Sequence, residues 1–233
     1  MLRRLFPTTL SLLATLLLLA ACESSPPPPE KSPPAAPESA ATAASLTNQY
    51  DGRPVIVAFG DSLTAGFGVA PGQGYPGFLQ RKLDEAGYSY HVVNEGVSGD
   101  TSSAGVVRVD SVIAHKPEVV IVAFGGNDGL RGLPVASMEQ NLREIITRLQ
   151  AAGAKVVLGG MTLPPNYGRE YVSKFEIVYP RLAKELDAAL IPFLLEGVAA
   201  RPELLYDEIH PNAKGNEIVA GVVFEVLEPL LNK

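Results

Sequence analysis

Residues 55–63 read Val-Ile-Val-Ala-Phe-Gly-Asp-Ser-Leu. The first five side chains are apolar and mostly β-branched, a pattern typical of a short strand buried on both faces of a parallel sheet. Gly60 permits the backbone angles of a tight turn, and Asp61 and Ser62 follow it where a helix would begin. We therefore predict a strand that turns directly into a helix, with the Ser62 hydroxyl projecting above the sheet. Taken alone, the same residues are equally consistent with an ordinary helix cap.

Further apolar runs follow the first strand at intervals along the chain, and we predict a short strand at each. They are residues 92–93 with the flanking tyrosines, 119–124, 156–158 and 190–195. Apolar residues at spacings of three and four predict helices between and after these strands. Strands that alternate with helices predict an α/β fold, in which helices cover both faces of a five-stranded parallel sheet.

The apolar stripes outline three of these helices. The first covers residues 135–149 and should end at Gly153. The second covers residues 171–186, and Pro180 should kink or split it because proline cannot donate the helical hydrogen bond. The third covers residues 218–230. We interpret all three stripes as faces that pack on the core.

A carboxylate and an imidazole lie close together near the C-terminal end. Asp207 and His210 are one turn apart, and Pro211 disfavours helical angles at His210, which predicts a loop before the last helix. A serine hydroxyl becomes a good nucleophile when an imidazole takes its proton and a carboxylate orients that imidazole. Ser62, His210 and Asp207 are therefore candidates for nucleophile, base and orienting acid. An isolated Asp-x-x-His pair is more simply a surface histidine beside a capping aspartate.

Two glycine-containing loops, residues 94–101 and 125–129, follow other predicted strands. In an α/β sheet the reactive loops gather beyond the carboxyl ends of the strands. Acyl transfer needs hydrogen-bond donors placed around a developing oxyanion. The backbone N–H groups of Ser62 and Gly99 and the side-chain amide of Asn127 are candidates for these donors. Each loop can also be read as a plain turn.

Four blocks occur in a fixed order: Gly-Asp-Ser-Leu at 60–63, the glycine loop, Gly-Gly-Asn-Asp at 125–128 and Asp-x-x-His at 207–210. Together they resemble the SGNH (GDSL) hydrolase family over residues 57 to about 212. The resemblance implies a three-layer α/β/α, flavodoxin-like fold and a serine hydrolase that cleaves carboxylic esters or thioesters through an acyl-enzyme. The site residues that it implies are Ser62, Asp207 and His210 as the catalytic triad, with Ser62, Gly99 and Asn127 around the oxyanion.

Some stretches are similar to a narrower branch of that family, the periplasmic thioesterases and lysophospholipases, also called arylesterases. These stretches are residues 98–101, GGNDGLRG at 125–132 and LPPNYG at 163–168. The resemblance implies that the last two line the acyl-binding cleft, and that the substrate is a small-molecule or lipid ester. The acyl-binding residues expected on this basis are Leu130, Leu133, Leu163 and Pro164.

Two other functions stay open from the sequence. The first is a carbohydrate deacetylase of the cell envelope, because related SGNH proteins have that activity. The second is a non-catalytic envelope lipoprotein that binds lipid or a protein partner. The intact Asp-x-x-His block disfavours the second reading, since a binding module does not need a serine, a base and an orienting acid.

The N-terminal residues predict export. Arg3 and Arg4 precede an uncharged, Leu-rich run over residues 10–20, which predicts a secretory signal peptide over residues 1–21. Cys22, the only cysteine of the chain, follows Leu-Ala-Ala, and this resembles the lipobox of bacterial lipoproteins. We expect lipidation of Cys22 and attachment to a membrane surface, with Glu23 indicating the periplasmic face of the outer membrane. The alternative is a chance cysteine at the end of an ordinary signal peptide.

Composition divides the remaining chain into a linker and a domain. Residues 22–49 are rich in Pro, Ala, Ser and Glu and cannot bury enough apolar surface to fold, whereas residues 50–233 have the length of one domain. The net charge is −6, and we expect no nucleic-acid partner because no basic cluster is present. The histidines lack metal-ligand spacing, so we expect neither a metal nor another cofactor. The sequence does not indicate an oligomeric state.

Overall fold

The structure is a computed structural model, and it describes residues 50–233. The predicted signal peptide, the lipidation site Cys22 and the predicted linker over residues 22–49 lie outside the described residues. Within residues 50–233, every helix is too short or too polar to span a lipid bilayer.

The centre of the domain is a five-stranded sheet in the order β2-β1-β3-β4-β5, and all of its neighbouring strands run parallel. Its strands are β1 (Val55–Gly60), β2 (His91–Gly96), β3 (Val119–Ala123), β4 (Lys155–Gly159) and β5 (Ala189–Ile191). The predicted five-stranded parallel sheet is therefore confirmed. The last strand is shorter than expected, because Pro192 has no N–H to continue the ladder.

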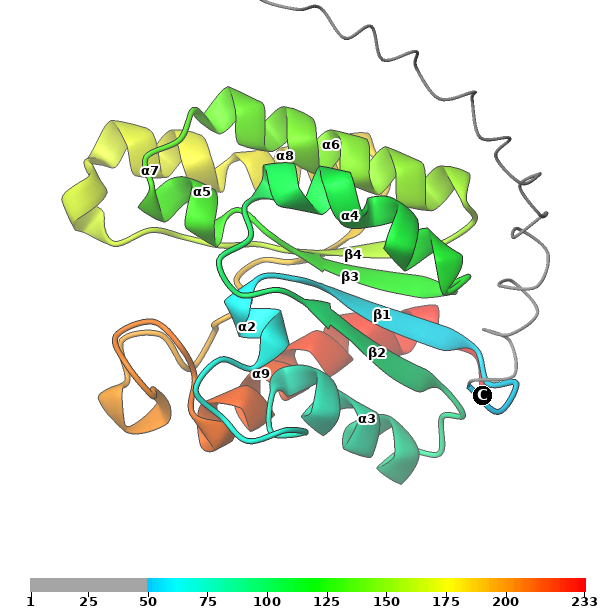
Figure 1. The fold of residues 1–233 in the computed structure, drawn as a ribbon. Helices are drawn as coiled ribbons and strands as arrows, with labels where there is room; N and C mark the ends of the chain where they lie inside the picture. The colour runs from blue at the N-terminus through cyan, green and yellow to red at the C-terminus, as the bar shows by residue number, and fades with distance from the viewer. Residues whose placement is uncertain (1–49) are drawn as a thin grey trace, which may run out of the picture. The chain divides into compact units, whose positions relative to one another are not determined.

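Helices cover both faces of this sheet (Figure 1). One face carries α4 (Ser102–Ala114), α6 (Val135–Ala151), α7 (Arg169–Glu176) and α8 (Val178–Glu185), and the other carries α3 (Tyr75–Glu85) and α9 (Ala213–Leu227). Shorter elements complete the domain: α2 (Ser62–Ala65), α5 (Gly126–Leu130), and the 3₁₀ turns η1 (Pro165–Tyr167), η2 (Pro202–Leu204) and η3 (Glu228–Leu230). This is the three-layer α/β/α arrangement expected from the sequence.

Alternate side chains of β1 pack into the two hydrophobic cores, one on each face of the sheet. Val57 and Phe59 pack into the core beneath α4, α6 and α8, whereas Ile56 and Ala58 pack into the core beneath α3 and α9. All four are fully buried. The strand is thus apolar throughout because both of its faces are covered, as the sequence pattern indicated.

The helix predicted over residues 171–186 is split, but the break does not lie at Pro180 itself. α7 ends at Glu176 and α8 begins at Val178, so Pro180 lies in the first turn of α8. A proline there removes no helical hydrogen bond, whereas its ring would clash with the carbonyl of a residue four positions earlier in a continuous helix. The predicted split is confirmed, with its position set three residues before the proline.

Candidate active site

Ser62 is the first residue of α2 and directly follows the tight turn at the end of β1, as predicted. Asp61 is the N-cap residue of α2, and its Oδ1 accepts a hydrogen bond of 3.0 Å from the backbone N–H of Leu63. A Cβ at Gly60 would lie 2.2 Å from the Thr64 hydroxyl and 2.7 Å from the Ala123 carbonyl oxygen. Glycine at position 60 therefore lets the chain turn sharply enough to place Ser62 at the carboxyl end of β1.

His210 lies in a closed loop that precedes α9, also as predicted. Leu205 and Pro211 form an isolated antiparallel bridge, and the Tyr206 N–H donates to the His210 carbonyl at 2.7 Å. Asn216, in the first turns of α9, donates from its side-chain amide to the Pro211 carbonyl at 2.8 Å. These bonds fix the loop at both ends and present the imidazole toward β1.

Ser62, His210 and Asp207 form one continuous hydrogen-bonded chain. The Ser62 Oγ lies 2.9 Å from His210 Nε2, and His210 Nδ1 lies 2.8 Å from Asp207 Oδ2. Residues 148 positions apart in the sequence thus meet at hydrogen-bond distance. The order hydroxyl, imidazole and carboxylate is the one that activates a serine for nucleophilic attack.

Asp207 is held as a carboxylate. Its Oδ1 accepts from the backbone N–H groups of Ile209, at 2.8 Å, and of His210, at 2.7 Å. Burial alone would raise the pKa of Asp207, but these two N–H bonds and the imidazole contact outweigh it and lower the pKa to about 2. The carboxylate therefore stays charged across the physiological pH range and keeps the Nδ1 proton of His210 facing it.

Two of the three predicted oxyanion donors are backbone N–H groups with no acceptor. Ser62 is the first residue of α2, and Gly99 has a φ of +86°, a conformation that favours glycine. Among the hydrogen bonds of residues 50–233, neither the Ser62 N–H nor the Gly99 N–H donates one. Both residues line the cavity beside the Ser62 hydroxyl. Both N–H groups are therefore available to an incoming oxygen atom.

Asn127, the third predicted donor, lies on the one-turn helix α5 rather than in the loop expected from its glycine-rich sequence. Gly125 enters this helix with a φ of +111°, which explains why a turn-like sequence precedes it. The Asn127 side-chain nitrogen donates to the Asp100 carbonyl at 2.9 Å and to Asp61 Oδ2 at 3.2 Å. Asn127 lines the same cavity as Ser62 and Gly99. Because these two bonds use both N–H groups of the amide, the predicted oxyanion role requires Asn127 to exchange the longer bond, to Asp61, for a bond to the substrate oxygen.

The cavity next to Ser62 has a volume of about 560 Å³. Three of the four predicted acyl-binding residues, Leu130, Leu163 and Pro164, line it. The fourth, Leu133, does not: it follows Gly132 in the turn beyond α5, and 38% of it is exposed. The turn at Gly132 directs the chain away from Ser62. The prediction that Leu133 lines the acyl-binding cavity is therefore wrong.

The GDSL-like lipase/acylhydrolase family model matches residues 58–218. The chain belongs to this family. Esterase TesA of Pseudomonas aeruginosa is 40% identical over 191 residues, which cover 81% of this chain and 95% of the relative. Thioesterase 1/protease 1/lysophospholipase L1 of Escherichia coli is 40% identical over 179 residues, covering 76% and 85% respectively.

Similarity to solved structures supports the same family assignment. A crystal structure of TesA superposes with a TM-score of 0.73 at 41% identity, over 76% of this chain and 99% of that one. The predicted SGNH family, its thioesterase and arylesterase branch, and the ester-hydrolase activity are confirmed by these similarities. The hydrolase fold predicted from the sequence is confirmed by the same superposition.

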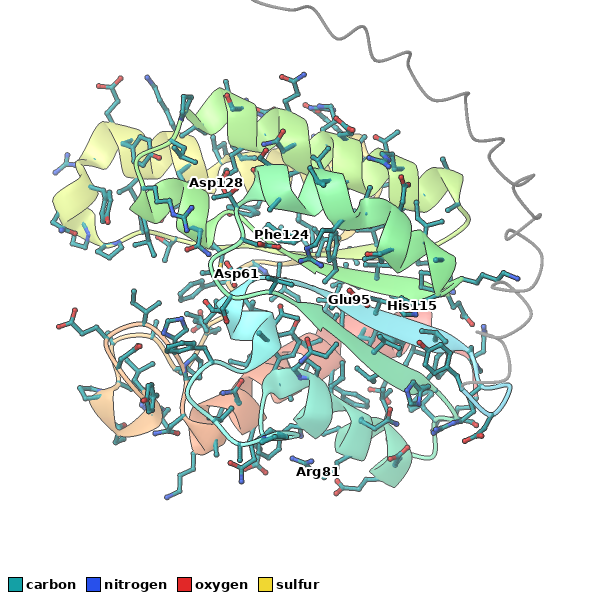
Figure 2. All side chains as sticks on the ribbon, viewed as in Figure 1. Asp61, Arg81, Glu95, His115, Phe124 and Asp128 are labelled. Atoms are coloured by element: carbon teal, nitrogen blue, oxygen red, sulfur yellow. The ribbon has the colours of Figure 1, made fainter. Side chains whose placement is uncertain are left out.

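Asp61 is a part of the hydrolase site that the sequence presented only as a helix cap. It is 4% exposed, and its two carboxylate oxygens join the start of α2 to the Asn127 amide. Burial raises the pKa of Asp61 to about 6, although the Leu63 N–H, His210 and Asn127 each lower it. Figure 2 shows Asp61 beside the carboxyl end of β1, where α2 begins.

A second buried carboxylate, Asp128, joins α4 to α5 in this hydrolase. Its Oδ2 accepts from the Ser102 N–H at 2.8 Å, and its Oδ1 accepts from the Ser102 hydroxyl at 2.6 Å. Asp128 is 3% exposed and directly follows Asn127 (Figure 2). This contact could not be predicted from the sequence, because 26 residues separate the partners and neither belongs to a periodic pattern.

Other apolar residues, which were not predicted from the sequence, also line the cavity. Phe67, Met161, Phe193, Leu195, Leu205 and Ile209 line the cavity. Phe67 lies in a glycine-rich stretch after α2, and Met161, Leu205 and Ile209 lie in loops. Phe193 and Leu195 belong to the run predicted as a buried strand, but β5 ends at Ile191 and both residues lie beyond it. Only the folding of these separate loops toward one end of the sheet identifies them as neighbours of Ser62.

Within residues 50–233, no group of three His, Cys, Asp or Glu side chains is arranged to hold a metal ion. His115 has its Nδ1 2.7 Å from the Tyr50 hydroxyl and its Nε2 2.8 Å from Glu95 Oε1. His91 is the first residue of β2, and its Nδ1 lies 3.2 Å from a guanidinium nitrogen of Arg53. These two histidines therefore have structural partners away from Ser62.

Proposed function

We propose that this chain hydrolyses carboxylic esters and thioesters through an acyl-enzyme on Ser62. One observation carries the proposal: the hydroxyl of Ser62, the imidazole of His210 and the carboxylate of Asp207 are hydrogen-bonded in series beside a mostly apolar cavity. Three residues in these roles convert an unreactive alcohol into a nucleophile at neutral pH.

In the first half-reaction, His210 Nε2 accepts the proton of the Ser62 hydroxyl while its oxygen attacks the carbonyl carbon of the ester. The imidazolium that results is stabilised by Asp207, which faces Nδ1 at 2.8 Å. His210 then gives the proton to the departing alcohol or thiol, and the acyl group stays on Ser62.

The negative charge that develops on the carbonyl oxygen is received by three donors. We assign this role to the Ser62 N–H, the Gly99 N–H and the Asn127 side-chain amide, because all three residues line the cavity. Loss of a single donor of this kind costs about 3–4 kcal/mol of transition-state stabilisation. In the second half-reaction His210 activates a water molecule, which releases the acid and restores Ser62.

The substrate class follows from the cavity. Leu130, Leu163 and Pro164 provide apolar contacts suited to an acyl chain. Relatives of this chain are named for esterase, thioesterase, lysophospholipase and arylesterase activities. We propose short to medium acyl esters, acyl thioesters and lysophospholipids as substrates, bound with the acyl chain along these residues.

A serine-directed probe tests the proposal. A Ser62→Ala variant should not be labelled by a fluorophosphonate and should hydrolyse p-nitrophenyl acetate about 10⁶-fold more slowly, or at background. Ser173→Ala, which removes an exposed serine on α7, is the matched control and should behave as wild type. Retention of wild-type turnover by Ser62→Ala would exclude Ser62 as nucleophile.

We also propose that the chain is exported and anchored by lipid on Cys22, with residues 22–49 as a tether and residues 50–233 as the catalytic domain. The support is in the sequence: a positively charged start, an apolar run and the Leu-Ala-Ala-Cys stretch at 19–22. Acyl chains on Cys22 would hold the enzyme at a membrane surface, and the outer membrane is the destination that Glu23 favours.

A further inference from the structure

The cavity beside Ser62 has two walls, which are anchored on opposite faces of the sheet. The first wall consists of Leu130, Leu163 and Pro164. The second wall consists of Phe67, Phe193, Leu195, Leu205 and Ile209. Leu130 and Leu163 pack on the core beneath α4, α6 and α8, whereas Phe193, Leu195 and Leu205 pack on the core beneath α3 and α9.

The ribbon shows the same division. At the carboxyl ends of the strands, α5 and α7 lie on one side of the sheet and the orange segment before α9 lies on the other (Figure 1). Met161 packs against both cores and lines the cavity between them. A substrate bound at Ser62 can therefore place one substituent against each wall.

The position of His210 decides which substituent meets which wall. An ester has two substituents on its reacting carboxyl group, the acyl chain and the alcohol that departs. The imidazole Nε2 must deliver its proton to the departing oxygen or sulfur atom, so that atom has to lie within hydrogen-bond distance of His210. The acyl chain carries no such requirement.

The second wall is the one that contacts this imidazole, through Phe67. The ring of Phe67 lies with its centroid 4.6 Å from that of His210, and Ile209 directly precedes His210 in the chain. An alcohol that leaves from His210 Nε2 therefore departs along the second wall, while the acyl chain is left facing Leu130 and Leu163.

From this geometry we propose that the second wall is a leaving-group subsite that binds uncharged apolar alcohols and thiols, aromatic ones included. The proposal rests on the acyl-enzyme function above. It adds which part of the protein recognises the departing half of the substrate. The first wall and the second wall then recognise the two halves of the ester independently.

The exposed apolar surface of the protein supports a hydrophobic occupant here. Phe67 is 45% exposed, Ile209 is 43% exposed, and the neighbouring Tyr206 is 60% exposed. The rings of Phe67 and Tyr206 pack edge to face with centroids 6.1 Å apart. Such rings at the mouth of a cavity gain free energy when an apolar or aromatic group covers them.

The charges at the second wall disfavour an anionic leaving group. Glu208 lines the cavity, and Asp207 adjoins it as a carboxylate. Among the described residues that line the cavity there is neither a lysine nor an arginine to pair with a phosphate. A neutral alcohol or thiol therefore fits this wall better than a phosphorylated one. Among the proposed substrates, we accordingly expect lysophospholipids, whose departing alcohol carries a phosphodiester, to be cleaved less efficiently than simple esters.

Matched esters test the subsite. Phenyl acetate and 2-naphthyl acetate carry the same acyl group and differ in the size of the departing phenol. Phe67→Ala should lower kcat/KM for 2-naphthyl acetate relative to phenyl acetate by about tenfold, the scale of one lost aromatic contact, and Ile209→Ala should lower the same ratio by a smaller factor. Ile177→Ala, a substitution of an isoleucine 55% exposed and outside the cavity, is the control and should leave the ratio unchanged.

A crossed measurement separates the two walls. Across p-nitrophenyl esters of increasing acyl length, Leu130→Ala should change the dependence on chain length, whereas Phe67→Ala should not. Hydrolysis of the acyl-enzyme should also proceed at the wild-type rate in Phe67→Ala, because the alcohol has already left. An unchanged naphthyl-to-phenyl ratio, or an altered acyl-length profile in Phe67→Ala, would overturn the subsite while leaving the Ser62 mechanism intact.

A thioester pair tests the charge preference. An acyl-CoA and the N-acetylcysteamine thioester of the same acid share the reacting group, but only the first has an anionic leaving group. At low ionic strength we expect kcat/KM for the uncharged thioester to equal or exceed that for the acyl-CoA. A clear preference for the acyl-CoA that salt abolishes would contradict a neutral subsite.

Discussion

Asp61 joins two parts of the catalytic apparatus through one carboxylate. Its Oδ1 caps α2 at the Leu63 N–H, and its Oδ2 receives the Asn127 amide. The amide nitrogen of Asn127 also donates to the Asp100 carbonyl. Asp61 therefore positions both the helix that begins with Ser62 and the side chain that we assign to the oxyanion.

An Asp61→Asn substitution should lower kcat by about tenfold and change KM little, a smaller effect than the 10²–10³-fold cost of losing an oxyanion donor outright. An amide has one oxygen acceptor where a carboxylate has two, so either the α2 cap or the Asn127 anchor is lost. Steady-state kinetics with p-nitrophenyl acetate measures this split between kcat and KM.

The pH dependence distinguishes positioning from a general structural defect. The pKa of Asp61 is raised to about 6, so the wild-type residue takes up a proton as the pH falls through that value, whereas asparagine has nothing to titrate. The ratio of wild-type to Asp61→Asn kcat should therefore narrow below about pH 6. A ratio that stays constant from pH 5 to pH 8, or an unchanged kcat, would contradict this role.

At the scale of elements, the position of His210 depends on how α9 is fastened to α3. Asn216 in α9 is 2% exposed; its Oδ1 accepts from the Tyr75 N–H at 2.9 Å, and its amide donates to the Pro211 carbonyl at 2.8 Å. One side chain thus joins the start of α3, the start of α9 and the residue after His210. The two helices and the catalytic loop are placed together.

An Asn216→Leu substitution should lower the free energy of unfolding by about 2–4 kcal/mol, because it leaves the buried Tyr75 N–H and Pro211 carbonyl without partners. The substitution should also reduce kcat, because a shift of Pro211 displaces the preceding residue, His210. Urea unfolding and ester hydrolysis measure the two effects. Glu217→Gln, at the next and exposed position of α9, should change neither; equal effects of both substitutions would contradict the assignment.

At the scale of the whole molecule, the catalytic domain and the proposed anchor are separate parts of the chain. The residues that we propose as triad and oxyanion donors, and those that line the cavity, all lie within residues 60–210. We therefore expect ester hydrolysis to proceed without the N-terminal segment, whose proposed task is to place the enzyme at a membrane.

Full-length protein expressed in a bacterium should incorporate labelled palmitate and sediment with membranes, and Cys22→Ser should lose both properties because no other cysteine is present. The specific activity of Cys22→Ser toward p-nitrophenyl acetate should equal that of wild type. Label retained by Cys22→Ser would contradict lipidation at this residue.

The sequence by itself determined the layered fold and the family, and it named the residues that we propose as catalytic groups. Continuous apolar runs of five or six residues, as in β1, predict strands covered on both faces, and helical periodicity outlines α6 and α9. The blocks around Ser62, Gly99, Asn127 and His210 occur in the order, and with the residue types, of the family motif. These features are local, so a linear pattern records them.

Only the tertiary structure decided what surrounds those groups. The Asp61–Asn127 and Asp128–Ser102 bonds, the absence of Leu133 from the cavity and the second wall of Phe67 and Ile209 all depend on where separate loops meet. Side chains in aperiodic loops acquire neighbours only when the strands that carry those loops align at one end of the sheet. Residue spacing along the chain does not predict how closely these loops meet. That distance is set by packing among elements far apart in the sequence.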